Sequence, residues 1–414
     1  MDEYENKCKY NLAETCAASI SINELCELSE NKDIKPTDLI DTSAIQTYGE
    51  IKGSTALREN LSRLYSSKTG TSLSPENILI TPGAIAANHL VAYALLEPGD
   101  HVICQYPTYQ SLYSIPESLG AKVDYWKCKP ENDWIPGFAD LESLIKPTTK
   151  LLILKYATQT ESLSPPLTQL TFPSSNPQNP TGAILPKPLL QKIITLAEAH
   201  PNLTIHSDEV YRPLFHSISP MSPSFPPSIL SLGHASTIAT GSLSKAYSLA
   251  GIRVGWIATR SASLATRLAS ARDYTTIAVS RLDQAVAAHA LAPETVHALL
   301  GRNIALARTN LELLERFVIK HDEYCSWTKP VAGTTAFIKF SRDGKAVDAG
   351  AFCKILMEKT GVMFLPGDAG FGYEWKGYVR VGFVNRTEVV REGLEECRKF
   401  MRREFEEVVP VHDE

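Results

Sequence analysis

The chain has 414 residues, of which 43% are hydrophobic and 21% charged, the composition of an ordinary globular protein with room for one large and one smaller domain. A net charge of −5 predicts no basic face for nucleic acid or an anionic membrane. No apolar run reaches the about 18 residues that cross a bilayer, and the N-terminal residues lack the apolar core of a signal peptide. Eight cysteines without a Cys-x-x-Cys pair argue against a zinc site and predict reduced thiols in the cytoplasm.

Residues 46–292 are predicted to form a large α/β domain, because short apolar segments alternate with helical ones. We expect a mostly parallel, seven-stranded sheet. Its strands are predicted at residues 77–81, 101–104, 122–126, 151–154, 204–207, 238–240 and 254–258, with helices at 84–95, 188–198 and 261–290.

The pattern changes at residue 293. A long helical segment at 295–320 precedes a strand pair around 335–340 and 378–383, and then a C-terminal helix. Residues 293–414 are therefore predicted to form a smaller α+β domain, which the N-terminal arm at 1–45 partly completes.

Two turns follow strands early in the chain. In Thr81-Pro82-Gly83-Ala84-Ile85 the backbone N–H groups of Gly83 and Ala84 can bind a phosphate at a helix N-terminus, although many strand-to-helix turns look alike. Tyr109 follows the next strand and can stack on a flat cofactor ring, whereas an aromatic residue there otherwise packs in the core.

A third turn reads Asn176-Pro177-Gln178-Asn179-Pro180-Thr181-Gly182. Its two Asn-Pro steps make it rigid enough to fix an amide side chain at the carboxyl end of a strand, where open α/β sheets bind ligands. The alternative is a plain surface turn.

The segment Ile205-His206-Ser207-Asp208-Glu209-Val210-Tyr211 ends another strand with an acid and a phenol three residues apart. A carboxylate such as Asp208 beneath a pyridine nitrogen keeps that nitrogen protonated, so that the ring withdraws electrons. Tyr211 can hydrogen-bond the ring oxygen and lower the pKa of an imine. Alternatively, Asp208 caps a helix; His206 is assigned to the core.

Lys245 lies in Gly241-Ser242-Leu243-Ser244-Lys245-Ala246-Tyr247, and Arg253 follows. A lysine among small hydroxyl residues with a fixed cation nearby can form a Schiff base with pyridoxal phosphate (PLP), while Ser242 and Arg253 hold the phosphate. The alternative is a solvated lysine on a helix.

In this order the motifs resemble the class I/II aminotransferases of PLP fold type I, from about Tyr48 to Arg380. The resemblance implies Lys245 as the Schiff-base lysine and proton carrier, and Asp208 at the pyridine nitrogen. It places Asn179 and Tyr211 at the 3-oxygen and Tyr109 on the ring. It also implies a phosphate cradle made of Gly83, Ala84, Ser242 and Arg253.

Two further residues gain roles from the resemblance alone. Arg380, in Gly377-Tyr378-Val379-Arg380-Val381-Gly382-Phe383, matches the arginine that clamps the substrate α-carboxylate, and Asn179 joins it as a substrate-binding residue. Tyr48 matches the tyrosine that reaches the phosphate of the partner subunit, which implies a homodimer.

The resemblance implies a cytoplasmic aminotransferase acting on an amino acid and a keto acid. Among the family, the chain is most similar to capreomycidine-synthase-like enzymes, which suggests specialised metabolism. A cyclase or a β/γ-eliminating lyase of the same fold, or an inactive PLP-binding regulatory protein, stays open as an alternative. Glu14 is a candidate for meeting a basic substrate side chain, or it is simply solvated.

Residues 155–175 depart from the family, which usually runs from this strand almost directly into the Asn-Pro turn. The segment is either a surface insertion or a translated intron. The intron hypothesis is favoured because splicing within the codons of Lys155 and Ser175 restores Leu-Asn-Asn-Pro-Gln-Asn-Pro-Thr-Gly. A retained insertion is expected to pull Asn179 away from its strand and to weaken PLP retention; sequencing the mature transcript decides between the two.

Overall fold

The computed structural model describes residues 4–66, 72–155, 178–218 and 227–412. Most of the segment at 155–175, together with Asn176 and Pro177, lies outside the described residues, whereas Lys155 lies within them. None of the helices in the described part of the chain is long and apolar enough to cross a membrane.

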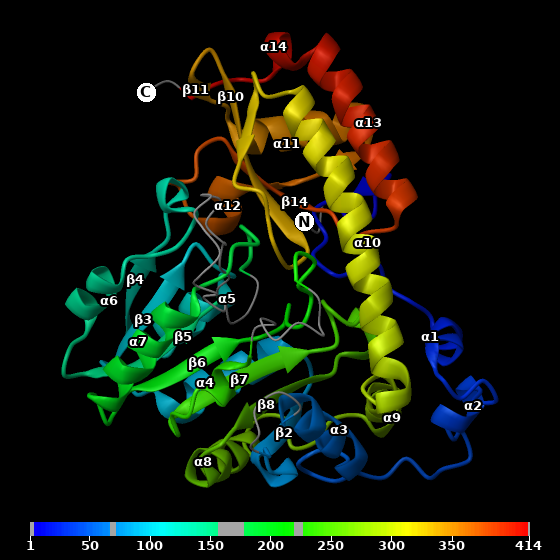
Figure 1. The fold of residues 1–414 in the computed structure, drawn as a ribbon, viewed down its shortest axis with the longest axis vertical. Coiled ribbons are helices and arrows are strands. Elements are labelled where there is room, and N and C mark those ends of the chain that lie inside the picture. Colours follow the sequence, from blue (N-terminus) through cyan, green and yellow to red (C-terminus); the bar gives the residue numbers. More distant parts are fainter. Residues whose placement is uncertain (1–3, 67–71, 156–177, 219–226, 413–414) are drawn as a thin grey trace, which may run out of the picture.

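The large domain is built on a seven-stranded sheet in the order β2-β8-β7-β6-β5-β3-β4 (Figure 1). Strands β3 to β7 run parallel to one another, and β8 is antiparallel to both β2 and β7. The predicted α/β class with a mostly parallel sheet is confirmed. The strands span Ile78–Thr81 (β2), His101–Tyr106 (β3), Lys122–Lys127 (β4), Thr149–Leu154 (β5), Thr204–Asp208 (β6), Thr237–Ser242 (β7) and Gly255–Thr259 (β8).

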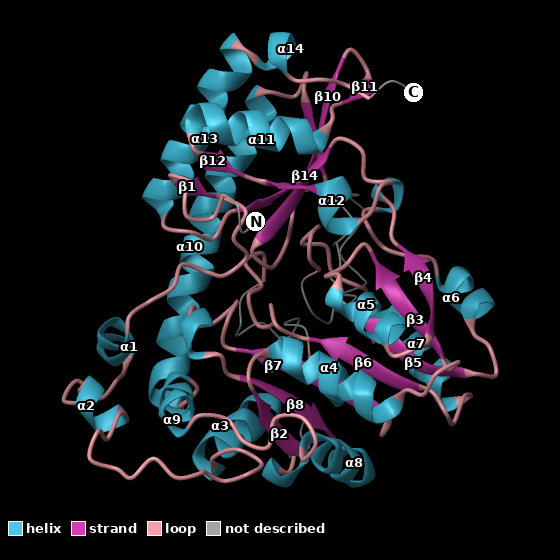
Figure 2. Ribbon diagram, turned by 180° about the vertical axis from the view of Figure 1, so that it is seen from behind, coloured by secondary structure: helices cyan, strands magenta, loops and turns pink. Residues whose placement is uncertain are grey.

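Helices cover both faces of this sheet, as expected for strands that are apolar on both sides. Helix α4 (Ala84–Leu95) packs on β7 and β8 and lies in front of the strands in Figure 2. The other helices of this domain are α3 (Thr55–Ser66), α5 (Ser111–Ser118), α6 (Phe138–Leu144), α7 (Lys187–Glu198), α8 (Ala262–Arg272) and α9 (Arg281–Ala290).

The continuous helix predicted over 261–290 is wrong, because the chain breaks between α8 and α9. Thr275, Thr276 and Ile277 fall in this break, and β-branched residues favour helices weakly. Ile277 has a φ of 60°, in the left-handed region. Ser280 then caps α9, since its side chain accepts a hydrogen bond from the backbone N–H of Asp283.

The smaller domain packs helices against a second sheet, ordered β11-β10-β14-β13 with β9 beside β10. Its central strands, β10 (Thr335–Arg342) and β14 (Tyr378–Gly382), are antiparallel. Around them lie β9 (Cys325–Trp327), β11 (Lys345–Ala346), α11 (Ala349–Thr360), β12 (Val362–Met363), β13 (Leu365–Pro366), α12 (Gly367–Phe371), α13 (Thr387–Arg403) and α14 (Phe405–Val408).

Two segments connect the domains. Helix α10 (Pro293–Lys320) runs from the end of α9 along the smaller domain, where it packs on α13 (Figure 1). The N-terminal arm contributes β1 (Tyr10–Asn11), which pairs with β12. It continues past the large domain into α1 (Ile22–Leu28) and α2 (Pro36–Leu39). The arm therefore contacts both domains, because the Ala17 N–H donates to the Lys245 carbonyl and the Ala18 N–H to the Val384 carbonyl.

Candidate active site

A cavity of about 650 Å³ lies where the carboxyl ends of the parallel strands face the smaller domain. Open α/β sheets bind their ligands at this edge. All of the predicted site residues except Gly83 and Tyr48 line it: Ala84, Tyr109, Asn179, Asp208, Tyr211, Ser242, Lys245, Arg253 and Arg380.

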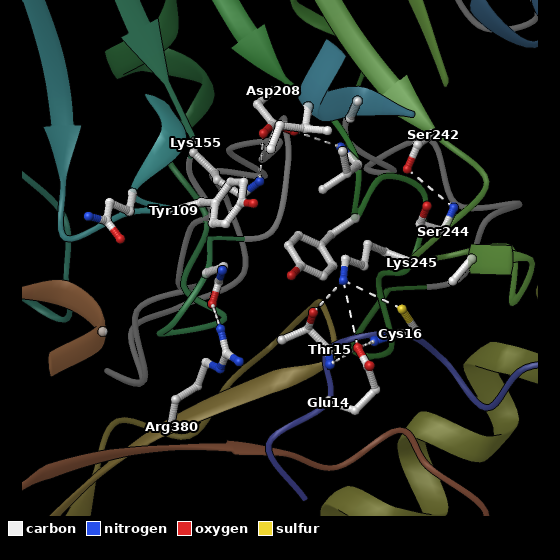
Figure 3. A pocket seen from close by; sticks show the side chains of 18 of the residues that line it. Glu14, Thr15, Cys16, Tyr109, Lys155, Asp208, Ser242, Ser244, Lys245 and Arg380 are labelled. Carbon is white, nitrogen blue, oxygen red and sulfur yellow. Dashed lines mark hydrogen bonds and ion pairs between the residues drawn. The ribbon is translucent and has the colours of Figure 1, made fainter. Parts of the chain in front are cut away.

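Lys245 enters the cavity from the turn after β7 (Figure 3). Its Nζ donates to Thr15 Oγ1 at 2.6 Å, and lies 3.4 Å from Cys16 Sγ and 3.7 Å from Glu14 Oε1. The N-terminal arm thus surrounds the amine with acceptors.

These neighbours set the charge of the amine. Burial by itself lowers the pKa of Lys245, but Tyr211, Cys16 and Glu14 outweigh burial and raise it. For Glu14, burial favours the neutral acid, yet Lys245 and hydrogen bonds from Cys16 and Thr15 lower its pKa. Burial raises the pKa of the Cys16 thiol to about 11. The group is therefore an ammonium held beside a carboxylate and a neutral thiol.

Asp208 is the last residue of β6 and is almost completely buried. Its Oδ2 accepts hydrogen bonds from Asn88 Nδ2 at 3.2 Å and from Lys155 Nζ at 2.9 Å, and its Oδ1 accepts one from the backbone N–H of Val210 at 3.2 Å. Thr240 donates to the other end of the Asn88 amide at 2.7 Å, which fixes its orientation. The carboxylate is held rigidly at the floor of the cavity.

A pocket for an anion lies where α4 begins beside Arg253. Gly83 precedes α4 with a φ of 85°, and a Cβ there would lie 2.7 Å from Arg253 Nη2. Arg253 Nη1 donates to Ser244 Oγ at 3.4 Å, and the Ser244 backbone N–H donates to Ser242 Oγ at 3.2 Å. A guanidinium, two hydroxyls and a helix N-terminus form a donor set that suits a phosphate.

Arg380 crosses from β14 of the smaller domain into the same cavity (Figure 3). Its Nη2 donates to the Ala13 carbonyl at 2.7 Å and its Nη1 to Asn179 Oδ1 at 3.3 Å, whereas its buried Nε has no hydrogen-bond partner among the described residues. Burial lowers the pKa of this guanidinium. A buried cation with a free donor is an incomplete site for a carboxylate.

The expectation that a retained insertion displaces Asn179 is wrong. Asn179 is buried in the cavity although residues 156–177 precede it. The turn is held by its own contacts, because the Gly182 N–H donates to the Gln178 carbonyl at 2.9 Å and Gln178 Nε2 donates to the Pro107 carbonyl at 3.1 Å. These contacts do not depend on a short connection to β5.

The remaining predicted residues lie at the margins. Tyr109 is 41% exposed at the cavity mouth, and Tyr48 lies outside the cavity with 77% of its surface exposed.

His206 is buried, and its Nε2 shares a hydrogen bond with Thr240 Oγ1, 3.1 Å away. Burial lowers the pKa of His206 to about 4.

The sequence did not identify Lys155 and Asn88 as cavity residues. Asn88 could have been noticed, since it is one of the few polar residues on a mostly apolar helix. Lys155 could have been noticed as well, because it directly follows a buried parallel strand.

Comparisons with known proteins identify the family. The family model for aminotransferase class I and II matches residues 19–396. The arginine–pyruvate transaminase AruH of Pseudomonas aeruginosa is 28% identical over 355 residues, which cover 85% of this chain and 81% of that protein. Capreomycidine synthase of Streptomyces vinaceus is 28% identical over 317 residues, covering 77% and 72%.

A solved PLP-dependent aminotransferase from Streptococcus suis is also similar, with a TM-score of 0.82 and 36% identity over 97% of this chain and 96% of that one. The fold and the site define a PLP enzyme of fold type I. The chain belongs to the class I and II aminotransferases, and its cofactor is pyridoxal phosphate.

Proposed function

We propose that this protein is an aminotransferase that moves an amino group from an amino acid to a keto acid in specialised metabolism. One observation carries the proposal: the cavity holds Lys245 and Asp208 together with Arg380, a buried cation whose Nε is free. A lysine, a ring-facing carboxylate and a carboxylate clamp are what amino-acid chemistry on PLP requires.

The residues present fit the cofactor. The missing side chain at Gly83 lets the Arg253 guanidinium lie beside the N-terminus of α4, since any Cβ there would lie too close to the guanidinium. PLP supplies a protonated ring that withdraws electrons from the substrate's α-carbon. Arg253, Ser242, Gly83 and Ala84 would hold its phosphate, and Asp208 its ring nitrogen.

The other residues act on the substrate. Arg380 would bind the α-carboxylate and so orient the Cα–H bond, with Asn179 holding the guanidinium in place. Lys245 would form the covalent bond with the cofactor, and once released by the substrate would carry the proton removed from the α-carbon. Tyr211 would hydrogen-bond the 3-oxygen of the ring, and Tyr109 would stack on its face.

Glu14 is proposed to select a basic substrate. It is the only carboxylate besides Asp208 on the described cavity wall. It is paired with Lys245, 3.7 Å away, and loses that cation when the amine is bound covalently to the cofactor. A cationic side chain of the substrate would then restore its charge balance, and the similarity to a protein named arginine–pyruvate transaminase supports this choice.

The active enzyme is proposed to be a cytoplasmic homodimer. Ile45, Tyr48 and Tyr274 are exposed apolar side chains, with exposures of 85%, 77% and 82%. The segment carrying Ile45 lies against α9, because Arg281 Nη1 donates to the Ile45 carbonyl at 3.1 Å. A second copy covering this surface would bring Tyr48 to its partner's phosphate. Sedimentation of the native protein tests this proposal.

The test of function is a product assay. The PLP-loaded protein is incubated with single amino acids, arginine and lysine included, together with pyruvate. A keto acid from the donor and alanine from pyruvate support transamination. Ammonia or a cyclic product identifies the lyase or cyclase alternative, and an unchanged cofactor spectrum with every amino acid identifies the inactive alternative.

A further inference from the structure

The cavity contains a second lysine, which is buried and for which the proposed reaction has no role. Lys155 follows β5, and its side chain is only 2% exposed. Its Nζ lies 2.9 Å from Asp208 Oδ2 and 5.0 Å from the centre of the Tyr211 ring. Figure 3 shows it directed at Asp208 beside Tyr109, on the wall where the cofactor ring would lie.

The position of Lys155 is determined by its backbone. Its N–H donates to Gln105 Oε1 at 3.0 Å, and Gln105 Nε2 contacts Cys128 Sγ at 3.3 Å. Gln105 belongs to β3, which neighbours β5 in the sheet. The backbone of Lys155 is therefore fixed at the edge of the sheet, and its side chain starts from a fixed point.

The contact occupies Asp208. A carboxylate has about four acceptor positions, two on each oxygen. Asn88 and Lys155 fill those of Oδ2, and Val210 takes one of the two on Oδ1. The ammonium also cancels the carboxylate charge, and that charge is what would keep a pyridine nitrogen protonated.

We infer that Lys155 is a competing cation that blocks Asp208 and weakens the binding of pyridoxal phosphate by this chain. A protonated ring nitrogen and the Lys155 ammonium cannot share one carboxylate in a buried site without strong repulsion. The cofactor must displace the lysine or bind with its nitrogen unprotonated. The inference rests on the proposed role of Asp208. It concerns the chain as printed, because the spliced chain would have asparagine at position 155.

The test compares PLP binding by the purified full-length chain and four variants. Lys155→Met keeps the length of the side chain and removes its charge. Lys155→Asn introduces the residue that the spliced chain would have, and Lys155→Arg keeps the charge. Lys146→Asn is the matched control, since Lys146 precedes β5 and pairs with Asp124 at the surface. The readouts are the PLP dissociation constant, from absorbance titration, and the ¹⁵N NMR shift of ring-labelled PLP.

The Met and Asn variants should bind PLP at least tenfold more tightly than the parent, with a ring nitrogen shift of the protonated form. The Arg and Lys146 variants should match the parent. Equal or weaker binding by the Met and Asn variants would overturn the inference. Should the Met variant fail to fold by circular dichroism, the Asn variant decides, because it also removes the charge.

Failure of the proposed function would look different. Adding Asp208→Asn to the Met variant should return the ring nitrogen to its unprotonated shift. An unchanged ring nitrogen shift in this double variant would show that Asp208 does not have its proposed role, and it would overturn the inference as well. Tight binding by the parent chain, with a protonated nitrogen, would leave the proposed function standing and overturn the inference alone.

Discussion

Replacing Arg380 with lysine tests the proposed carboxylate clamp. The substitution keeps the positive charge but removes the planar fork, which can place two N–H groups against one carboxylate. In the structure one edge of that fork is anchored, by Ala13 and Asn179, and Nε is free. The geometry therefore leaves the Nε–H and one further N–H of the same guanidinium for the substrate.

The magnitude follows from the donors lost. Each hydrogen bond to a charged group contributes roughly 1.5–3 kcal/mol. Lysine can keep one of the two, so Arg380→Lys should lower kcat/KM for the amino-acid substrate by roughly tenfold to 150-fold, the factor that corresponds to the loss of one such bond.

The assay measures kcat/KM with the preferred amino acid and with the corresponding amine, which lacks the α-carboxylate. The variant should be impaired with the amino acid and almost unchanged with the amine, and its PLP affinity should match that of the parent. A loss of equal size with both substrates would refute the clamp, because the effect would then not depend on the carboxylate. A variant that binds PLP poorly would also contradict it, since Arg380 would then support the cofactor site.

Three further predictions concern the cofactor site. Lys245→Ala should abolish the absorbance that PLP acquires on covalent attachment; if that absorbance persists, Lys245 is not the attachment residue. Glu14→Gln should shift the pH profile of PLP incorporation to lower pH. The Glu14 charge contributes to the raised pKa of Lys245, and only the neutral amine attacks PLP, so removing the charge gives more reactive amine at a given pH. The shift should be less than about one pH unit, because both side chains are partly exposed and water screens the pair. Glu27→Gln, at an exposed position, is the control. An unchanged profile in Glu14→Gln would contradict the coupling between the Glu14 charge and the pKa of Lys245. Gly83→Ala should weaken PLP binding and lower the unfolding free energy by roughly 1–2 kcal/mol, since its Cβ would meet Arg253 Nη2 at 2.7 Å and its φ of 85° disfavours alanine. Calorimetry and PLP titration measure the two effects. Gly99→Ala is the control that separates backbone strain from the contact, because Gly99 has a φ of 91° and open space around it. Equal PLP affinity in the parent and in Gly83→Ala would contradict the proposed phosphate cradle.

Much of the site was predictable because its residues stand at the ends of strands. Asp208 ends β6, and Ser242 ends β7 three residues before Lys245. Parallel strands place their carboxyl ends at one edge of the sheet, so a reading of local motifs also predicts that these side chains meet. The same logic identified the turn at Gly83, whose conformation only glycine adopts easily.

The break between α8 and α9 was missed for a local reason. The segment 261–290 has helical periodicity at both ends, and the three weak helix formers between them could have been tolerated. The conformation of Ile277 and the cap at Ser280 decided the matter in the folded chain.

The sequence alone determined the class of protein and the cofactor, and it predicted the attachment lysine, because each depends on a short motif whose chemistry is local. Only the tertiary structure decided what surrounds that lysine and its counterpart carboxylate. Lys245 meets Thr15 across 230 residues of chain, and Asp208 meets Lys155 across 53 and Asn88 across 120. Contacts at such separations arise from how the arm, the sheet and α4 pack together, and no spacing within a motif encodes them. The packing is also what turned Lys155 from one more lysine after a strand into the ion-pair partner of Asp208.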